Sequence, residues 1–205
     1  MAISPDVILA SSSTYRQSLL KKIVSDFLIQ SPNIDETPKP SEPPHKLAER
    51  LAIQKAEKVA ESFSNHLIIG SDQVAELNGN LIGKPGNHPN AVNQLRQSSG
   101  ATLTLYTGLA LLNSATQRLQ SVVDRYEVEF RILTDEQIEK YLSSEKPYDC
   151  CGSLKAEGSG IRLLKRLTGN DPNTLIGLPL IQLTSMLINE GVDPFDFQNT
   201  NPLRQ

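Results

Sequence analysis

Short apolar runs alternate along this chain with stretches of helical periodicity, and this alternation limits the folds that the chain can adopt. Residues 7–10 and residues 67–72 each have the pattern of a buried strand, and residues 44–63 between them repeat apolar side chains at helical spacings. The first run ends in Ser11–Thr14, which is typical of a helix N-cap, and the second run ends on Asp72. The pattern indicates an α/β fold with a mixed sheet.

The remaining elements fit the same fold class, and no repeat or long linker divides them. Asn78-Gly79 is a hairpin signal, and residues 31–44 contain five prolines, which predicts a loop. Further helices are expected over residues 15–23, 89–97 and 179–189 and after Thr134, and further strands over residues 27–30, 126–132 and 101–112, the last with a break at Gly108. We expect a single domain over residues 1–191 and a C-terminal tail over residues 192–205.

Composition and charge exclude several classes of partner. The chain has 205 residues, with 20 Lys and Arg against 23 Asp and Glu, so its formal net charge is −3. A protein that coats nucleic acid needs a strong basic excess, so no nucleic-acid partner is expected. No apolar stretch approaches the roughly 18–20 residues of a membrane span, and the first residues lack a secretory signal, so no membrane association is expected. The adjacent Cys150 and Cys151 indicate a reducing compartment, which predicts a cytoplasmic protein.

The first candidate site is the pattern Ala10-Ser11-x-Ser13-x-x-Arg16. A strand that runs directly into a helix presents unpaired backbone N–H groups at the helix start. Two hydroxyls and an arginine one turn later add donors that suit a phosphate group. The alternative interpretation is an ordinary serine N-cap followed by a surface arginine.

Acidic residues form the second candidate site. Asp35 and Glu36 lie in the proline-rich loop, and Asp72 lies at the end of a buried strand. Hard cations such as Mg²⁺ bind to one or two carboxylates together with phosphate oxygens and water. A carboxylate at a strand end is also well placed to act as a general base. Alternatively, these residues are a solvated loop acid and a turn residue.

Two lysines stand out by their positions. Lys55 falls on the apolar stripe of the expected helix over residues 44–63, where a charged side chain is unusual. Lys84 lies in Gly83-Lys84-Pro85 after the hairpin, where glycine permits close approach of a ligand. The alternatives are a lysine that extends its ammonium out of the core, and an ordinary turn lysine.

Together these residues resemble the Maf-like nucleoside triphosphate pyrophosphatase family. The similarity extends in order from residue 9 to residue 179, so it covers most of the chain. The matching segments are Leu9-Ala10-Ser11-x-Ser13-x-x-Arg16, Asp35-Glu36-Thr37, Gln54-Lys55-Ala56, Gly70-Ser71-Asp72, Gly83-Lys84-Pro85, Tyr106-Thr107-Gly108, Cys150-Cys151-Gly152-Ser153 and Asp171 to Pro179.

Three variable positions resemble the branch of that family that hydrolyses 7-methylguanosine triphosphate: Tyr15, Gln73 and Glu157. Methylation at N7 gives guanine a positive charge, and an aromatic face attracts a cation by roughly 0.5–2 kcal/mol. A carboxylate accepts hydrogen bonds from the guanine N–H edge and offsets that charge. Tyr15 and Glu157 supply these two features, although this branch often has tryptophan where Tyr15 stands.

The resemblance implies an elongated α/β domain of the inosine triphosphatase-like kind, with helices that flank a mixed, twisted sheet and a central cleft for the nucleotide. It implies cleavage between the α- and β-phosphates with a divalent cation, Mg²⁺ or Mn²⁺. The implied roles are phosphate binding for Ser11, Ser13, Arg16, Lys55 and Lys84, metal binding for Glu36 and Asp72, proton acceptance for Asp72, and base selection for Tyr15, Gln73 and Glu157.

Other functions stay open from the sequence. The substrate is 7-methyl-GTP on the first hypothesis, which suggests removal of modified nucleotides before they enter nucleic acids. It is dTTP, UTP or an inosine-type triphosphate on a second. A third hypothesis is a non-catalytic nucleotide sensor that regulates cell division, because the family has been associated with arrest of division. A sensor has no need of a base at Asp72. The expected partner is a small-molecule nucleotide, and a homodimer is a further possibility.

Overall fold

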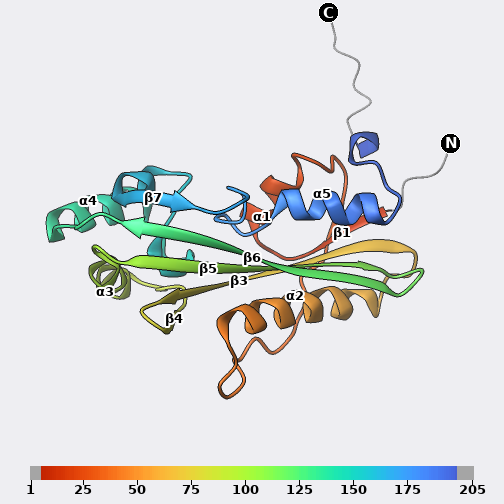
Figure 1. Cartoon of the computed structure of the whole chain (residues 1–205), viewed down its shortest axis with the longest axis horizontal. Helices are drawn as coiled ribbons and strands as arrows, with labels where there is room; N and C mark the ends of the chain where they lie inside the picture. The colour runs from red at the N-terminus through yellow and green to blue at the C-terminus, as the bar shows by residue number, and fades with distance from the viewer. Residues whose placement is uncertain (1–5, 198–205) are drawn as a thin grey trace, which may run out of the picture.

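The computed structural model describes residues 6–197 of the chain. Figure 1 shows an elongated molecule in which helices flank both faces of one twisted sheet. The strands are β1 (Asp6–Ala10), β2 (Leu28–Ile29), β3 (His66–Leu77), β4 (Asn80–Ile82), β5 (Thr102–Asn113), β6 (Arg118–Phe130) and β7 (Leu164–Thr168). The α-helices are α1 (Thr14–Leu20), α2 (Pro44–Ala60), α3 (His88–Ser98), α4 (Asp135–Glu145) and α5 (Leu180–Asn189). Short 3-10 helices cover Cys151–Ser153, Ser159–Leu163 and Pro194–Phe197.

The sheet combines a parallel part with an antiparallel part. Its strand order is β2-β1-β3-β5-β6-β7, and β4 pairs with β3 beside this path. Strand β1 runs parallel to β2 and β3, whereas β5, β6 and β7 follow in antiparallel order. The expected α/β class with a mixed, twisted sheet is confirmed.

One edge of β3 is interrupted where β1 ends. Strand β1 pairs with β3 as far as Ala10 opposite Gly70, and β4 pairs with β3 only from Ala75 onward. In the described part of the chain, residues 71–74 therefore have no strand neighbour on this edge. Asp72 lies in this gap, next to the turn that leads from β1 into α1.

Two helical layers bury one half of the sheet. Helix α2 packs its alanines and Val59 onto one face, against Ile8 of β1 and Ile68 of β3. Helices α1 and α5 cover the opposite face, where Leu9 and Ile69 are fully buried. In Figure 1 these layers lie below and above the sheet. The alternation of side chains along a strand explains why consecutive residues of β1 serve different layers.

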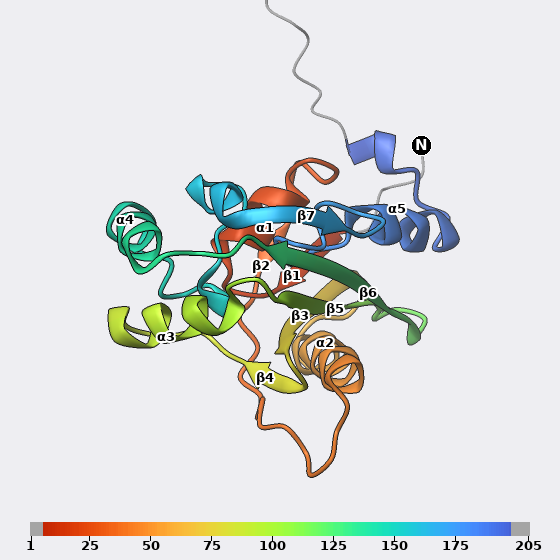
Figure 2. The same cartoon turned by 60° about the vertical axis from the view of Figure 1, so that its left-hand side comes forward.

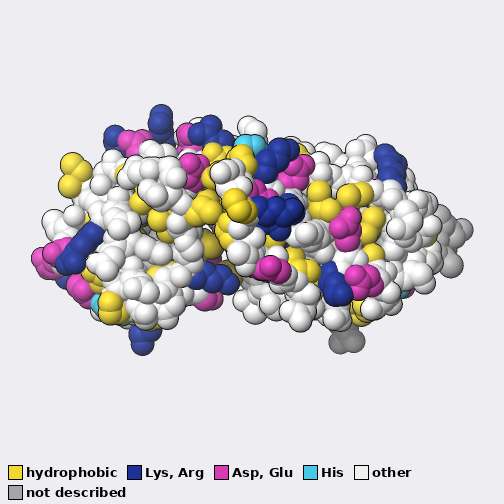
Figure 3. Space-filling view, turned by 90° about the horizontal axis from the view of Figure 1, so that it is seen from below, with side chains coloured by type: hydrophobic (Ala, Val, Ile, Leu, Met, Phe, Trp, Pro, Cys, Tyr) yellow, Lys and Arg dark blue, Asp and Glu magenta, His cyan; other side chains and the backbone are white. Residues whose placement is uncertain are grey.

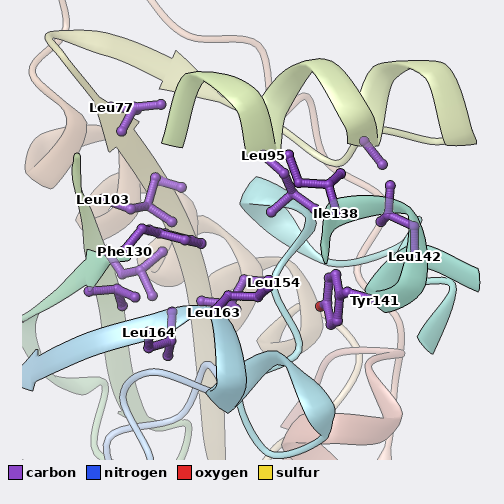
Figure 4. Close-up of a cluster of buried hydrophobic side chains, with 14 of the residues drawn as sticks. Leu77, Leu95, Leu103, Phe130, Ile138, Tyr141, Leu142, Leu154, Leu163 and Leu164 are labelled. Carbon is purple, nitrogen blue, oxygen red and sulfur yellow. The ribbon is translucent and has the colours of Figure 1, made fainter. Parts of the chain in front are cut away.

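A second core fills the other half of the molecule. Figure 4 shows Phe130 of β6 packed with Leu103 of β5, beside Ile138 and Leu142 of α4 and Leu95 of α3. Helix α4 begins with a capping box in which Thr134 and Gln137 satisfy each other's backbone N–H groups. Figure 2 shows α3 and α4 together at the left and α2 at the lower right, and in Figure 1 the two groups lie at different positions along the long axis. The molecule therefore has an α2 half and an α3–α4 half.

Helix α2 approaches the sheet closely at two glycines. A Cβ atom at Gly70 would lie 2.1 Å from the carbonyl oxygen of Ala52, and one at Gly108 would lie 2.1 Å from that of Ala48. The expected break of the strand at Gly108 is wrong, because β5 runs through this residue in register with β3 and β6. The missing side chain makes room for the helix instead of ending the strand.

Most expected elements are present, and their bounds differ by a few residues. Strand β6 is longer than the expected strand over residues 126–132, because its first half pairs with β5 without strict alternation of polar and apolar side chains. Strand β7 was not expected, because its sequence LKRLT has few apolar residues. Within the expected tail, Val192 is buried against the α5 layer, and residues 198–205 lie outside the described residues.

Charges of both signs are interspersed on the face shown in Figure 3, without a large area of one sign. This distribution agrees with the formal net charge of −3. Within residues 6–197, no helix has the length and hydropathy needed to span a bilayer.

Substitution of Gly70 tests the contact between α2 and the sheet. We expect Gly70→Ala to lower the free energy of unfolding by about 1–3 kcal/mol, because the new methyl group would force α2 away from β3. Urea denaturation followed by circular dichroism measures this change. Gly83→Ala is the matched control, because a Cβ atom there meets nothing within 4 Å. Equal urea midpoints for the two variants would show that the contact of α2 with Gly70 does not determine the stability of the protein.

Candidate active site

A cleft of about 590 Å³ opens where β1 ends, between the two halves of the molecule. Its walls come from the β1–α1 turn, the proline-rich loop, α2, β3, the β4–α3 turn, the loop after α4 and the segment before α5. The cleft brings together the ten side chains to which the resemblance assigns roles: Ser11, Ser13, Tyr15, Arg16, Glu36, Lys55, Asp72, Gln73, Lys84 and Glu157. Asp35, the other acid of the second candidate site, does not line the cleft and instead accepts the backbone N–H of Thr37. The roles assigned to them stay predictions.

The centre of the cleft is an ion-pair network around Lys55. Its Nζ lies 2.6 Å from Asp72 Oδ1 and 2.8 Å from Glu36 Oε1. Lys55 and Asp72 are only 6% and 8% exposed, whereas the side chain of Glu36 is 58% exposed. A buried ammonium requires this compensation, because an unpaired charge in the core is strongly destabilising. Lys55 can lie on the stripe of α2 that faces the sheet because Asp72 forms an ion pair with it there.

Two of the three ammonium donors of Lys55 go to the carboxylates, so one donor remains for a ligand. Among the described residues, the side chain of Asp72 makes polar contacts through Oδ1 only, and Asp72 lines the cleft. The arrangement allows one carboxylate to hold a cation and still accept a proton.

The β1–α1 turn supplies the anion donors. Ser13 caps α1 and accepts the N–H of Arg16, and its own hydroxyl proton remains available to a ligand. The guanidinium of Arg16 is held by two contacts, Nε to the carbonyl of Gly177 at 2.9 Å and Nη1 to Ser11 Oγ at 3.3 Å. Burial lowers the pKa of Arg16, while the charges of Asp72 and Glu36 act in the opposite direction. It stays charged at neutral pH.

Lys84 reaches the cleft from an anchored turn. The carbonyl of Gly83 accepts hydrogen bonds from the side chain of Gln94 at 3.1 Å and from the backbone N–H of Gly152 at 3.3 Å. Gln94 also accepts the hydroxyl proton of Ser153 at 2.6 Å. Two segments that resemble the family, Gly83-Lys84-Pro85 and Cys150 to Ser153, thus lie side by side. Gln94 connects them, and sequence reasoning missed it.

Tyr15 and Glu157 lie at the end of the cleft where the β1–α1 turn faces the loop after α4. The Tyr15 hydroxyl and Cys150 Sγ are 3.7 Å apart. Burial, followed by the contact with Cys150, raises the pKa of Tyr15 well above its ordinary value. Glu157 is exposed and close enough to Tyr15 to raise that pKa further. A neutral aromatic ring and an accessible carboxylate therefore stand at the same end of the cleft.

Gln73 has a second set of contacts besides the cleft. Its side-chain nitrogen donates to Thr107 Oγ1 at 3.0 Å and to the carbonyl of Thr174 at 2.8 Å. The amide donors are therefore engaged by the protein, and only the amide oxygen is available to select a base directly. Sequence reasoning missed the partners of this residue, although Thr107 and Thr174 fall in segments that resemble the family.

Metal binding fits the donor set. Residues 6–197 contain no group of three or more His, Cys, Asp and Glu side chains arranged to hold a metal ion. The two carboxylates of Glu36 and Asp72 approach the same ammonium, so a divalent cation there would share its coordination with a phosphate chain and water. Magnesium ions are commonly bound in this way, whereas an all-protein cage suits Ca²⁺ better.

Comparison with known proteins assigns the chain to a family. The sequence profile of the Maf-like protein family matches residues 6–190. The chain belongs to this family. A protein of Methylobacillus flagellatus named 7-methyl-GTP pyrophosphatase is 52% identical over 189 residues, which are 92% of this chain and 98% of that protein. The resemblance inferred from the sequence is confirmed.

The fold of this Maf-like protein is similar to that of a solved structure. The Ham1 protein of Staphylococcus aureus superposes with a TM-score of 0.51 at 15% identity, over 90% of this chain and 99% of that chain. At this level of identity the likeness concerns the fold alone. It agrees with the expected inosine triphosphatase-like architecture.

The reactivity of Cys150 tests the geometry of the cleft. Burial is the main cause that raises the pKa of this thiol to about 11. At pH 8 about one thousandth of the thiol is ionised, so in a Cys151→Ser background we expect alkylation by iodoacetamide to be roughly 100-fold slower than that of N-acetylcysteine. The rate should increase about tenfold per pH unit up to pH 11. A rate that levels off near pH 9 would contradict the burial of this thiol.

Proposed function

We propose that this Maf-like protein is a nucleoside triphosphate pyrophosphatase that hydrolyses 7-methyl-GTP to 7-methyl-GMP and diphosphate. The observation that carries the proposal is that one cleft contains both donors for phosphate groups and carboxylates. Ser11, Ser13, Arg16 and Lys84 offer donors to a triphosphate, and the carboxylates of Asp72 and Glu36 face them. The protein of Methylobacillus flagellatus named 7-methyl-GTP pyrophosphatase supports the reaction and the substrate.

The donors of the cleft bind the triphosphate and offset charge that develops during cleavage. Arg16 presents a planar set of N–H donors, of which the described residues use two out of five. Lys84 and the remaining donor of Lys55 add positive charge to the same space. Groups held in place by the fold stabilise developing charge without reorganisation, which is a major source of catalysis.

Asp72 accepts a proton from the attacking water. Its Oδ1 is held by Lys55 at 2.6 Å, so the carboxylate has a defined orientation at the wall of the cleft. The water attacks the α-phosphorus, the bond between that atom and the bridging oxygen breaks, and diphosphate leaves.

Glu36 and Asp72 would together hold a divalent cation, Mg²⁺ or Mn²⁺. Such an ion neutralises charge on the phosphate oxygens. Glu36 belongs to an exposed loop and is paired only with Lys55 among the described residues, so it can change partner as the ion binds. The cytoplasmic location expected from the sequence and a role in removing modified nucleotides belong to the same proposal.

A substrate panel tests the function. Diphosphate release is measured from 7-methyl-GTP, GTP, ITP, dTTP and UTP, with Mg²⁺ or Mn²⁺ and with EDTA. We expect turnover that depends on metal and favours 7-methyl-GTP. We expect Asp72→Asn to lower kcat by about two or more powers of ten while circular dichroism stays native, because the base is lost but the side chain keeps its shape.

Each outcome of the panel separates the hypotheses. Near-normal turnover by Asp72→Asn would remove the base role from this residue. Turnover that favours a pyrimidine or inosine nucleotide would retain the enzyme and reject the proposed substrate. Nucleotide binding without turnover would favour the sensor hypothesis. Full activity in EDTA would contradict the proposed metal.

Base selection is tested by exchanging two side chains. We expect Tyr15→Arg combined with Glu157→Gln to shift the preference from 7-methyl-GTP toward dTTP and UTP by at least tenfold in relative kcat/KM. The double variant removes the aromatic face and the carboxylate that offset the positive charge of the methylated base. Relative kcat/KM values across the panel provide the measurement. Ser143→Arg, at an exposed position of α4 that does not line the cleft, is the control for added charge. Unchanged ratios in the double variant would reject this assignment.

A further inference from the structure

A polar row, half-buried at Gln73 and buried at Thr107 and Asp124, crosses three strands on the face of the sheet opposite α2. Gln73 of β3 is paired in register with Thr107 of β5, and Thr107 is paired in register with Asp124 of β6. Thr107 is fully buried and Asp124 is 7% exposed. Buried polar groups of this kind are costly unless each has a partner, so their shared target is informative.

The shared target is Thr174, in the segment between β7 and α5. The hydroxyl of Thr174 donates to Asp124 Oδ2, and its carbonyl accepts from Gln73 Nε2 at 2.8 Å and from Thr107 Oγ1 at 3.0 Å. Thr174 is fully buried. The segment contains no long helix or strand, and its own backbone hydrogen bonds form only local turns. The side chains of Gln73, Thr107 and Asp124 attach these turns to the sheet.

The same segment orients the arginine of the cleft. Three residues beyond Thr174, the carbonyl of Gly177 accepts Arg16 Nε at 2.9 Å and Ser71 Oγ at 3.0 Å. Gly177 has a φ of +118°, a conformation that side chains rarely adopt. The position of this carbonyl, and with it the direction of the guanidinium, is therefore set by how the segment is anchored to the sheet.

We propose that Asp124 and Thr174 are positioning residues, which hold the carbonyl of Gly177 so that Arg16 is directed at the phosphate chain of the substrate. The inference rests on the proposed function in that it takes the ligand of Arg16 to be a polyphosphate. Gln73 would also act on the cleft indirectly. It binds the carbonyl of Thr174, and the next two residues, Leu175 and Ile176, line the cleft.

The test is a double-mutant cycle on binding of inorganic tripolyphosphate, measured by titration calorimetry. Thr174→Val keeps the shape of the side chain but removes the hydroxyl. We expect it to weaken binding about 10–50-fold in the wild-type background and less than about twofold in an Arg16→Met background, because the effect passes through Arg16. Thr174→Ser, which keeps the hydroxyl, should restore binding to within about threefold of wild type.

Two further variants complete the test. Thr104→Val makes the same chemical change on β5 at a position away from the cleft, and it should bind as wild type does. Asp124→Asn keeps an acceptor oxygen for Thr174. It should weaken binding about 3–10-fold, again only when Arg16 is present, and it provides a measurement where Thr174→Val is too unstable to purify.

Equal factors in both Arg16 backgrounds would overturn the proposal, as would Thr174→Val and Asp124→Asn variants that fold and bind tripolyphosphate normally. The proposed function is judged separately. Failure of the wild-type protein to release diphosphate from 7-methyl-GTP would contradict that function but not the positioning role, because the binding measurement involves neither base nor catalysis.

Discussion

The close approach of α2 to the sheet is the constraint on which the charged centre of the molecule depends. Gly70 and Gly108 carry no side chain, so the helix backbone lies directly on β3 and β5. On the helix packed in this way, Lys55 brings a buried ammonium to Asp72 and Glu36 at once. The carboxylates in turn make burial of the lysine tolerable. The packing of α2 on the sheet and the ion pairs of Lys55 therefore depend on each other.

Strand β3 divides two tasks between its faces. Asp72 projects toward α2 and joins the ion pairs, whereas Ser71 and Gln73, its neighbours on either side, project to the opposite face and anchor the segment before α5. Because a strand alternates its side chains, three consecutive residues reach groups that lie on opposite sides of the sheet. A one-residue shift of register would exchange these contacts, so the pairing of β3 with β5 is a condition for the site.

Sequence reasoning was most successful where a local pattern carries the information. The buried strands, the helix expected over residues 44–63, which ends at Ala60, and the exceptional position of Lys55 follow from periodicity. Local patterns also single out the serines, Arg16, the lysines and the carboxylates of the cleft, whereas Tyr15, Gln73 and Glu157 follow only from the resemblance to the family. Strand β7, the continuity of β5 at Gly108 and the row from Gln73 to Asp124 depend on pairing between distant segments. Such pairing leaves no local signal, since a polar residue within a strand looks the same whether it faces solvent or a buried partner.

The gap in the edge of β3 also affects what can enter the cleft. Free strand edges can pair with other chains, which promotes aggregation. Here the free stretch covers only residues 71–74, with β1 ending at one side and β4 beginning at the other. An incoming peptide would find too few backbone partners to form a stable strand. The interrupted edge therefore places Asp72 and Gln73 at the wall of the cleft and still resists the strand addition that an uninterrupted edge would allow.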